Sequence, residues 1–490
     1  MTKKFYLTTA VPYVNAAPHI GFALEVVQAD VLARYHRSLK EDVFFLAGTD
    51  ENSLKNFQAA QKEGITTQKL VDRNSKVFKN LGPALNLSFD DFIRTTESRH
   101  IKGAQKLWQA TQKNIYKKKY KGLYCVGCEM FFKESELENG LCPEHKTKPE
   151  VIEEENYFFK LSNYQKQLEK IIESGEIEII PESRKNETLS FIKSGLEDFS
   201  ISRSAKRGDG WGIEVPGDNS QRVYVWFDAL INYITALGYG SNNLERYKKY
   251  WPADLHCIGK GILRFHAIYW PAMLLSVGLP LPKKIFVHGY LTTEGQKMSK
   301  SLGNVIDPFE LVEKYGADPV RYFLLREFSS TEDGDFSIKR LEERYNADLA
   351  NGLGNLVSRV LTLSEKIEPE KENIPTQGRD PGIKDAVKGE LVSKIKLTKK
   401  NYQRALEEIK FNEALEAIWG LVSDCDNFVE KNKPWELDKG SDRFKDVISE
   451  LLTAVKESAL LLKPFLPQTA EKILKQIKEN KKAEALFPRL

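Results

Sequence analysis

The chain has 490 residues, a mass of 56.0 kDa and a formal net charge of +4, from 73 basic and 69 acidic residues. At roughly 100 to 200 residues per domain, this length predicts about three or four domains and excludes a single small module. Apolar residues make up 41% and charged residues 29%, which excludes a disordered or low-complexity chain. The net charge does not indicate a polyanion partner, so any nucleic-acid surface must be local.

The first fifty residues alternate between strand and helix patterns. An apolar strand is predicted over residues 5–10, a helix from about Gly21, and a second strand over 43–47 that ends at Gly48-Thr49-Asp50. This order favours a doubly wound parallel sheet, whose ligands lie beyond the carboxyl ends of the strands. We therefore expect the loops after both strands to face one crevice.

The later sequence changes character several times. A Lys-rich, Cys-containing stretch begins at Tyr116 and reads as an insertion, and the run 223–227 is strand-like. Strands at 255–258 and 285–287 with a helical segment 262–277 between them are predicted to complete the sheet, 367–382 reads as a surface loop, and the last 145 residues read as a helix bundle. We predict five segments: 1–115 and 221–292, the two halves of a Rossmann-like domain; 116–220, an inserted domain; 293–345, a short segment that follows the sheet; and 346–490, an α-helical domain.

No segment reads as membrane-spanning or as a secretory signal. The longest stretch without charged side chains, residues 265–282, contains His266 and three prolines and reads as buried. The first residues lack a long apolar core followed by a small-residue cleavage site, so we expect a cytoplasmic protein.

Three of the five cysteines are crowded into a pattern typical of a metal site. Cys125 and Cys128 are followed, after thirteen residues, by Cys142 and His145. Three thiolates and one imidazole suit tetrahedral zinc and leave no open coordination position. We predict a structural zinc site, with iron less favoured and chance clustering as the alternative.

Two further motifs point to phosphate chemistry. Pro18-His19-Ile20-Gly21 lies where a strand gives way to a helix, so a helix dipole, backbone N–H groups and His19 can face an anion. Lys297-Met-Ser-Lys300-Ser follows a strand and precedes Gly303, which places two ammonium groups on a loop that can neutralise developing phosphoryl charge. Alone, each has an ordinary alternative: a packed loop histidine and a solvated basic turn.

Together these motifs resemble those of the class I aminoacyl-tRNA synthetases, and the resemblance to methionyl-tRNA synthetases covers essentially the whole chain. It implies that 1–115 and 221–292 form the catalytic domain, 116–220 a connective domain with a zinc knuckle, 293–345 the lysine loop and a stem-contact segment, and 346–490 an anticodon-binding domain. The matching segments are Val11-Pro-Tyr13, Leu24-Glu25 with Gln28-Ala-Asp30, Gly48-Thr-Asp50, Trp226-Phe-Asp-Ala229, Ile258-Gly-Lys260, His288-Gly-Tyr290 and Asn355-Leu-Val-Ser-Arg359.

The resemblance implies roles for individual residues. His19, Lys297 and Lys300 would be catalytic and act on the ATP phosphates, and Asp50 would pair with the ammonium group of methionine. The further ATP-binding residues would be Gly21, Glu25 (on the ribose), Gly259 and His288, and the methionine pocket would be formed by Val11, Tyr13, Trp226, Ala229, Tyr233 and His266. Without the resemblance, these aromatic residues read as ordinary core.

The chain departs from the family pattern at two positions. Phe22 stands where the family usually has His, and Gly261 stands where it usually has Asp. Phe22 removes a phosphate-side donor, a loss that commonly costs about 10²- to 10³-fold in rate unless another group substitutes. Gly261 removes a carboxylate expected near the ribose.

The helical segment carries residues able to read RNA. Asn355 and Arg359 share one face of a helix, and Trp435 follows another helix. The resemblance implies that the three recognise the anticodon, by base-edge hydrogen bonds and stacking. The alternative is simple packing. The Lys-rich runs 113–121 and 475–482 could contact the RNA backbone, although each also suits a solvated face.

We therefore expect a methionine-tRNA ligase that uses ATP, Mg²⁺ and one structural Zn²⁺ and acts as a monomer on tRNA(Met), including initiator tRNA. Two alternatives are a class I synthetase for another apolar amino acid, disfavoured because no large editing insertion is present, and a non-catalytic tRNA-binding paralogue.

Overall fold

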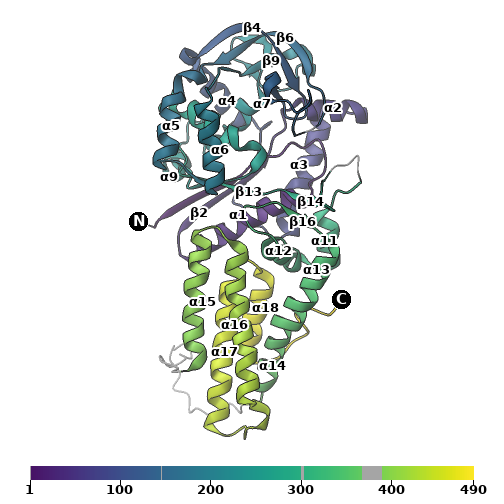
Figure 1. Ribbon diagram of the computed structural model, residues 1–490, viewed down its shortest axis with the longest axis vertical. Coiled ribbons are helices and arrows are strands. Elements are labelled where there is room, and N and C mark those ends of the chain that lie inside the picture. The colour runs from purple at the N-terminus through teal and green to yellow at the C-terminus, as the bar shows by residue number, and fades with distance from the viewer. Residues whose placement is uncertain (1, 145, 299–302, 367–388) are drawn as a thin grey trace. The chain divides into compact units, whose positions relative to one another are not determined.

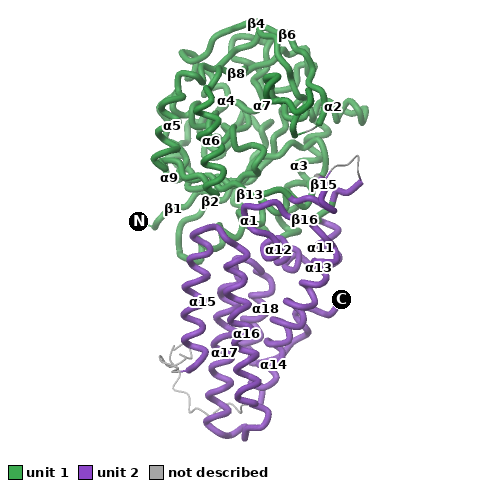
Figure 2. The backbone as a smooth tube through the Cα atoms, in the orientation of Figure 1, with its two compact units in different colours: residues 1–290, 306–308 green, residues 291–305, 309–490 purple. Residues whose placement is uncertain are grey.

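The structure is a computed structural model that describes residues 2–144, 146–298, 303–366 and 389–490 (Figure 1). It divides into two compact units (Figure 2): unit 1 comprises residues 1–290 and 306–308, and unit 2 comprises 291–305 and 309–490. The surface loop predicted at 367–382 lies within 367–388, outside the described residues. None of the helices in the described ranges has the length and apolarity needed to cross a bilayer.

A six-stranded parallel sheet forms the centre of unit 1, with the order β3-β2-β1-β12-β13-β7. The fold class predicted from the sequence is therefore confirmed. The strands are β1 (Lys4–Thr9), β2 (Asp42–Thr49), β3 (Asp91–Arg94), β7 (Glu178–Ile180), β12 (Leu255–Gly259) and β13 (Lys284–His288).

Strand β2 shows why the sheet is buried on both faces. Seven of its eight residues are buried, and apolar side chains run through it without alternation, as is typical of parallel strands covered by helices. Gly48 has no side chain to spare, because a Cβ there would lie 2.3 Å from the carbonyl oxygen of Ile93 on β3. Tight packing of β2 against β3 thus fixes the strand end that precedes Asp50.

The helices of unit 1 connect the strands, and the first three begin at side-chain caps. His19 caps α1, and Ser53 and Thr66 cap α2 and α3 by accepting backbone N–H bonds. The helices are α1 (Ile20–Ser38), α2 (Leu54–Glu63), α3 (Thr67–Ala84), α4 (Ser98–Ala110), α5 (Gln165–Ser174), α6 (Glu182–Lys193), α7 (Val225–Ala229), α8 (Asn232–Thr235), α9 (Glu245–Tyr250) and α10 (Trp270–Ser276).

Two smaller antiparallel sheets are built from the middle of the chain. One has the order β5-β4-β6-β8 and the other β10-β11-β9. Their strands are β4 (Ile115–Cys125), β5 (Met130–Phe132), β6 (Glu150–Phe159), β8 (Phe199–Ser200), β9 (Ser202–Ser204), β10 (Glu214–Val215) and β11 (Asp218–Val223). On β4, Lys119 and Lys121 lie opposite Glu155 and Glu153 of β6, so part of this basic run faces a matching acidic one. Strand β7 comes from the same stretch of sequence but is the edge strand of the main sheet.

The strand predicted over 223–227 is wrong. Strand β11 ends at Val223, and Val225 begins the short helix α7. Valine and aromatic side chains favour strands, but here they are buried in the core of unit 1, and tertiary packing overrides that weak preference.

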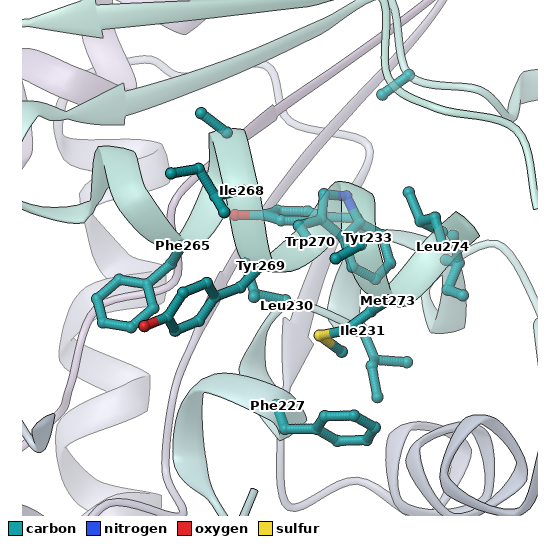
Figure 3. Packing of buried hydrophobic residues seen from close by; sticks show 14 of the residues in the cluster. Phe227, Leu230, Ile231, Tyr233, Phe265, Ile268, Tyr269, Trp270, Met273 and Leu274 are labelled. Atoms are coloured by element: carbon teal, nitrogen blue, oxygen red, sulfur yellow. The ribbon is translucent and has the colours of Figure 1, made fainter. Parts of the chain in front are cut away.

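The helical segment predicted over 262–277 is confirmed, with an irregularity. It opens with a 3₁₀ turn, Lys260–Ile262, continues as a π-helix over Phe265–Tyr269 and ends as α10. Its buried face packs against α7 and α8, where Phe227, Leu230 and Tyr233 meet Trp270 and Met273 (Figure 3). This core supports the residues that follow the sheet.

Unit 2 is mainly a bundle of amphipathic helices, as predicted. Helix α16 buries residues at three- and four-residue spacing from Phe411 to Val429. The elements of unit 2 are β14 (Leu291–Thr293), β15 (Gln296–Lys297), β16 (Gly334–Phe336), α11 (Pro308–Tyr315), α12 (Ala317–Arg326), α13 (Ile338–Arg344), the π-helix Tyr345–Gly354, α14 (Asn355–Ser364), α15 (Glu390–Glu407), α16 (Phe411–Asn432), α17 (Asp442–Leu462) and α18 (Pro467–Glu479).

Arg321 of α12 forms buried hydrogen bonds to the backbone of this bundle. Its side chain is fully buried, and Nε and Nη2 donate to the carbonyl oxygens of Phe465 and Pro464 at 2.7 and 2.8 Å. These carbonyls lie between α17 and α18, where the chain leaves a helix and its last acceptors lack partners in the helix itself. Arg321 therefore holds the turn between the two helices.

We expect R321M to destabilise unit 2 by about 2–4 kcal/mol, because it leaves two buried carbonyl oxygens without donors while it keeps the apolar stem. The loss of helical circular dichroism with urea measures this. The control is R443M, since Arg443 is exposed and contacts only Asn432 among the bonds described, and it should change stability by less than about 0.5 kcal/mol. Equal effects of the two variants would contradict the assignment.

Candidate active site

The carboxyl ends of the six parallel strands lie at one edge of the main sheet. Sequential connections run outward from β1 to β2 and β3 in one direction, and from β12 to β13 in the other, so the order reverses between β1 and β12. Open α/β sheets bind ligands at this switch point. The two predicted loops do come together there, because Asp50 N–H donates to the Pro12 carbonyl oxygen at 2.8 Å and Tyr13 forms a bridge with Asp50.

Glu25 connects two of the strand ends. Its carboxylate, 6% exposed, accepts the N–H of Ala10 at 2.8 Å and contacts Nε2 of His288 at 2.9 Å. Nδ1 of His288 donates to the Gly289 carbonyl oxygen at 2.7 Å, so it carries a proton, and the bond to Glu25 needs a second proton on one of the two partners. The pair ties α1, the end of β1 and the end of β13 together.

His19 lies at the start of α1, as predicted. It is exposed, and its Nδ1 accepts the N–H of Gly21 at 3.1 Å. A neutral imidazole that accepts at Nδ1 carries its proton on Nε2 and can donate from there. The N–H of Ile20, the first residue of α1, donates to the carbonyl oxygen of Ile306 at 3.0 Å. This bond attaches the segment that follows the lysine motif to the first turn of α1.

Asp50 lies in a buried acidic environment. It is 1% exposed, and burial, followed by the nearby carboxylates of Asp228 and Glu129, raises its pKa well above the ordinary value, although the N–H of Asn52 opposes the shift. A bound cation would offset the cost of ionising this buried carboxyl group, so the position favours a cationic ligand.

Asp228 fixes the loop that carries Asp50. It is fully buried and accepts from Nε2 of His100 at 2.5 Å and from Nδ2 of Asn52 at 2.7 Å. His100 is also fully buried, and its Nδ1 contacts the hydroxyl of Thr235 at 2.9 Å. Three separate elements therefore converge on the residues just after Asp50.

Aromatic side chains line the next part of the site. Trp226 stacks on Phe265 with ring centroids 3.8 Å apart, and Tyr13 lies 6.2 Å from Trp226. The Tyr13 hydroxyl is buried and has no hydrogen-bond partner within the described ranges, so it is a donor left for a ligand or water. Ala229 is buried nearby on α7, and Val11 follows β1 in the same loop as Tyr13.

Tyr233 and His266 form one hydrogen-bonded pair. The Tyr233 hydroxyl lies 2.7 Å from Nε2 of His266, whose Nδ1 lies 2.9 Å from the Ile262 carbonyl oxygen. The carbonyl can only accept, so Nδ1 carries the proton and Nε2 accepts from Tyr233. Burial lowers the pKa of His266 to about 4, so its ring is neutral at physiological pH. The pair is therefore neutral, and its described hydrogen bonds are internal to the protein.

Three predicted metal ligands come together. The sulfur atoms of Cys125, Cys128 and Cys142 all lie within 4.8 Å of one another, and those of Cys128 and Cys142 are 3.5 Å apart. Zn–S bonds of about 2.3 Å in a tetrahedron need sulfur atoms at about this spacing, so the three thiols could bind zinc. Burial by itself raises the pKa of the Cys125 thiol, but N–H donors from Cys128 and Gly127 lower it. The net shift in pKa is downward, which favours the thiolate. His145 lies outside the described residues.

The structure describes the backbone of Lys297 and Met298 in the lysine motif. The backbone of Lys297 ends the short strand β15, and Lys300 lies outside the described residues.

In unit 2, Asn355 and Arg359 lie on α14 and Trp435 follows α16. Arg359 contacts Glu430 at 2.7 Å and Asp426 at 3.6 Å, and Trp435 is 51% exposed. Asn355 is exposed and borders a hollow of about 410 Å³ whose other wall includes residues 482–489. Exposed aromatic and amide groups of this kind are available to RNA bases.

Two family sequence models match the chain. The family described as "tRNA synthetases class I (M)" matches residues 5–148 and 133–361, and the "Anticodon-binding domain of tRNA ligase" matches residues 389–489. Methionine–tRNA ligase of Brucella suis is 45% identical over 479 residues, covering 96% of this chain and 91% of that protein. The Thermotoga maritima enzyme of the same name is 44% identical and covers 98% of this chain and 76% of that protein.

The chain belongs to the methionine–tRNA ligase family of class I tRNA synthetases. Solved structures agree. Mycobacterium tuberculosis methionyl-tRNA synthetase in complex with methionyl-adenylate has a TM-score of 0.90 and 40% identity, with all of both chains covered. The free form from the same organism has a TM-score of 0.83 and 37% identity, with 100% and 99% of the chains covered.

Both departures from the family pattern are accommodated by packing. Phe22 contacts Phe78 of α3 at 5.1 Å between ring centroids, within a small apolar cluster. At Gly261, a Cβ would lie 2.0 Å from the hydroxyl oxygen of Tyr290, so glycine leaves room for that hydroxyl at the end of β12. Lys260 lies over the same Tyr290 ring, 4.8 Å from its centroid.

Several residues that build this site were not predicted from the sequence. Phe265, His100, Asn52 and Glu129 have no motif of their own, and their contacts join segments far apart in the chain. The one available signal was that Phe265 directly precedes His266.

We expect G261A to destabilise the chain by about 1–3 kcal/mol, because its methyl group would collide with the Tyr290 hydroxyl. The variant Y290F removes that oxygen, and the nearest remaining ring atom is 3.4 Å from the Cβ position. G261A should therefore be nearly neutral in the Y290F background, and a double-mutant cycle of thermal unfolding measures this coupling. Equal costs in both backgrounds would show that the hydroxyl is not the obstacle.

Proposed function

We propose that this protein activates L-methionine with ATP, forming methionyl-adenylate and pyrophosphate, and transfers the methionyl group to the 3'-terminal adenosine of tRNA(Met). The observation that carries the proposal is 45% identity to a methionine–tRNA ligase over 96% of the chain, combined with a buried carboxylate and an aromatic wall at the sheet's switch point. The adenylate named in the related solved structure is the intermediate of this reaction.

The ATP side of the site is assigned to the ends of β12 and β13 and to α1. His19 donates from Nε2 to a phosphate, Gly21 lets the nucleotide approach the first turn of α1, and Lys297 and Lys300 neutralise the charge that develops as pyrophosphate leaves. Gly259 and His288 lie at strand ends where the nucleotide would rest. Glu25 keeps a lone pair on each oxygen for the ribose, in addition to its two described bonds.

The methionine side is assigned to the aromatic wall and Asp50. Asp50 pairs with the ammonium group, and Val11, Tyr13, Trp226 and Ala229 enclose the side chain. The neutral Tyr233–His266 pair adds a polarisable surface, which suits a thioether better than a charged or strongly polar group.

The reaction needs positioning more than covalent catalysis. The methionine carboxylate attacks the α-phosphorus, the bond to the bridging oxygen breaks, and pyrophosphate leaves with that electron pair. The adenylate is then attacked by a ribose hydroxyl of the terminal adenosine, the 2'-hydroxyl if class I behaviour holds, and AMP leaves. Mg²⁺ is expected to accompany ATP and supply charge neutralisation.

The metal and the partners are proposed in the same way. Zn²⁺ bound by Cys125, Cys128, Cys142 and His145 would have a structural role, because four protein ligands fill its coordination. Asn355, Arg359 and Trp435 would read the anticodon. We also propose that the protein is a monomer that acts in the cytoplasm on both elongator and initiator tRNA(Met).

Exchange of labelled pyrophosphate into ATP tests the first step without tRNA. We expect exchange with methionine and none with leucine, isoleucine, valine or cysteine. Exchange with another of these amino acids would reassign the pocket, and none at all from folded, zinc-loaded protein would favour a non-catalytic tRNA-binding paralogue.

Methionine binding should weaken as the pH falls, because protonated Asp50 cannot pair with the ammonium group. Since the pKa of Asp50 is raised in the free protein, binding should also release a proton below that pKa. Calorimetry in two buffers of different ionisation enthalpy measures the proton release. D50N should bind methionine at least about tenfold more weakly and release no proton. Unchanged proton release from D50N would contradict the assignment.

If these residues read the anticodon, substituting them should slow the charging of tRNA(Met) and leave adenylate formation unchanged. N355A and W435A should lower kcat/KM for charging tRNA(Met) by about tenfold or more, the value of one lost stacking or base-edge contact. Both should leave pyrophosphate exchange unchanged, since no tRNA takes part in it. The control is W419A, because Trp419 packs on Tyr322 within unit 2 at 4.6 Å between ring centroids, and it should reduce stability instead.

A further inference from the structure

Glu129 is a buried carboxylate that the mechanism above does not use. It directly follows Cys128, is 1% exposed and adopts a φ of 49°, in the left-handed region that side chains other than glycine rarely occupy. A non-glycine residue held in this conformation costs about 1–3 kcal/mol and persists where its surroundings demand it. The contacts of its side chain, and those of the carbonyl groups of Cys128 and Glu129, account for this conformation.

The side chain reaches the start of α2. Oε1 of Glu129 accepts the N–H of Lys55 at 3.0 Å. Ser53 caps the same turn from within the loop, since its hydroxyl accepts the N–H of Asn56 at 3.1 Å. Glu129 thus supplies, from 74 residues away, an acceptor for an N–H group in the first turn of the ten-residue helix α2.

The backbone of the same two residues holds the aromatic wall. The Cys128 carbonyl oxygen accepts from Nε1 of Trp226 at 3.4 Å, and the Glu129 carbonyl oxygen accepts from the Tyr224 hydroxyl. Two consecutive residues of the cysteine knuckle therefore touch the start of α2 on one side and the segment 224–226 on the other.

We propose that Glu129 is a positioning residue for methionine: its carboxylate fixes the start of α2, and with it the Asp50 loop, at a set distance from the Trp226 wall. This inference deepens the proposed function and rests on it. Asp50 lies only four residues before the first residue of α2, so a shift of the helix start moves the ammonium-binding carboxylate. The residues assigned to ATP lie at the start of α1, on α1, β12 and β13 and in the lysine motif, whereas the side chain of Glu129 contacts α2 and its carbonyl oxygen contacts Tyr224.

The variants E129A and E129Q test this in the full-length, zinc-loaded protein. E129A removes the acceptor, and we expect the KM and Kd for methionine to rise about tenfold or more with the KM for ATP changed less than twofold. E129Q keeps an acceptor oxygen and should recover most of the methionine affinity. The matched control is E138A, because Glu138 lies in the same knuckle, has a side chain 61% exposed and pairs only with Lys146 among the ion pairs described.

Two further measurements separate positioning from simple loss of structure. The zinc content of E129A should equal that of the wild type, and hydrogen exchange at the amide of Lys55 should be faster in E129A without any substrate. Equal rises in the KM values for methionine and ATP, loss of zinc, failure of E129Q to recover, or unchanged exchange at this amide would each overturn the proposal. The exchange measurement needs no enzymatic activity, so it still tests the clamp if the proposed function fails.

Discussion

Carboxylates removed from water are the constraint on which the rest of the site depends. Asp228 and Glu51 are fully buried, and Asp50, Glu129 and Glu25 nearly so. A buried carboxylate is tolerated only when hydrogen-bond donors or cations surround it, so each one must draw its partners from other elements. Asp228 gathers His100 and Asn52, Glu51 binds Arg94, and Glu25 gathers Ala10 and His288. The loops at the carboxyl edge are therefore cross-linked by charge rather than by apolar packing alone.

The regular elements could be predicted where local sequence decides them. The apolar runs 5–10 and 43–47 form β1 and β2, because a strand that is buried on both faces is apolar along its length. The spaced apolar residues of the C-terminal third form helices, because a helix with one buried face repeats them at three- and four-residue intervals. The run 223–227 was assigned as a strand, and it failed because its strand-favouring residues form part of α7 inside a core. Composition gives no sign of that core, which is built by distant segments.

The site could be predicted in part, and the division follows sequence distance. Three cysteines within eighteen residues indicated a metal site, and their sulfur atoms do lie together. The role of Glu129 could not be foreseen, because its partner amide is 74 residues away and a single carboxylate has no motif. The accommodation of Phe22 by Phe78 and of Gly261 by Tyr290 is equally non-local. The individual roles of the site residues and the five-segment division stay predictions.

The π-helix over Phe265–Tyr269 limits how the sequence of this region can change in evolution. A π turn contains one residue more than an α turn, so losing a residue here would convert it into regular helix without breaking the chain. The same loss would rotate one side of the segment by about 100° relative to the other. Phe265 and His266 would leave their partners Trp226 and Tyr233. Sequence length in this short stretch is therefore constrained more strictly than residue identity, and divergent relatives should differ here by substitution rather than by insertion or deletion.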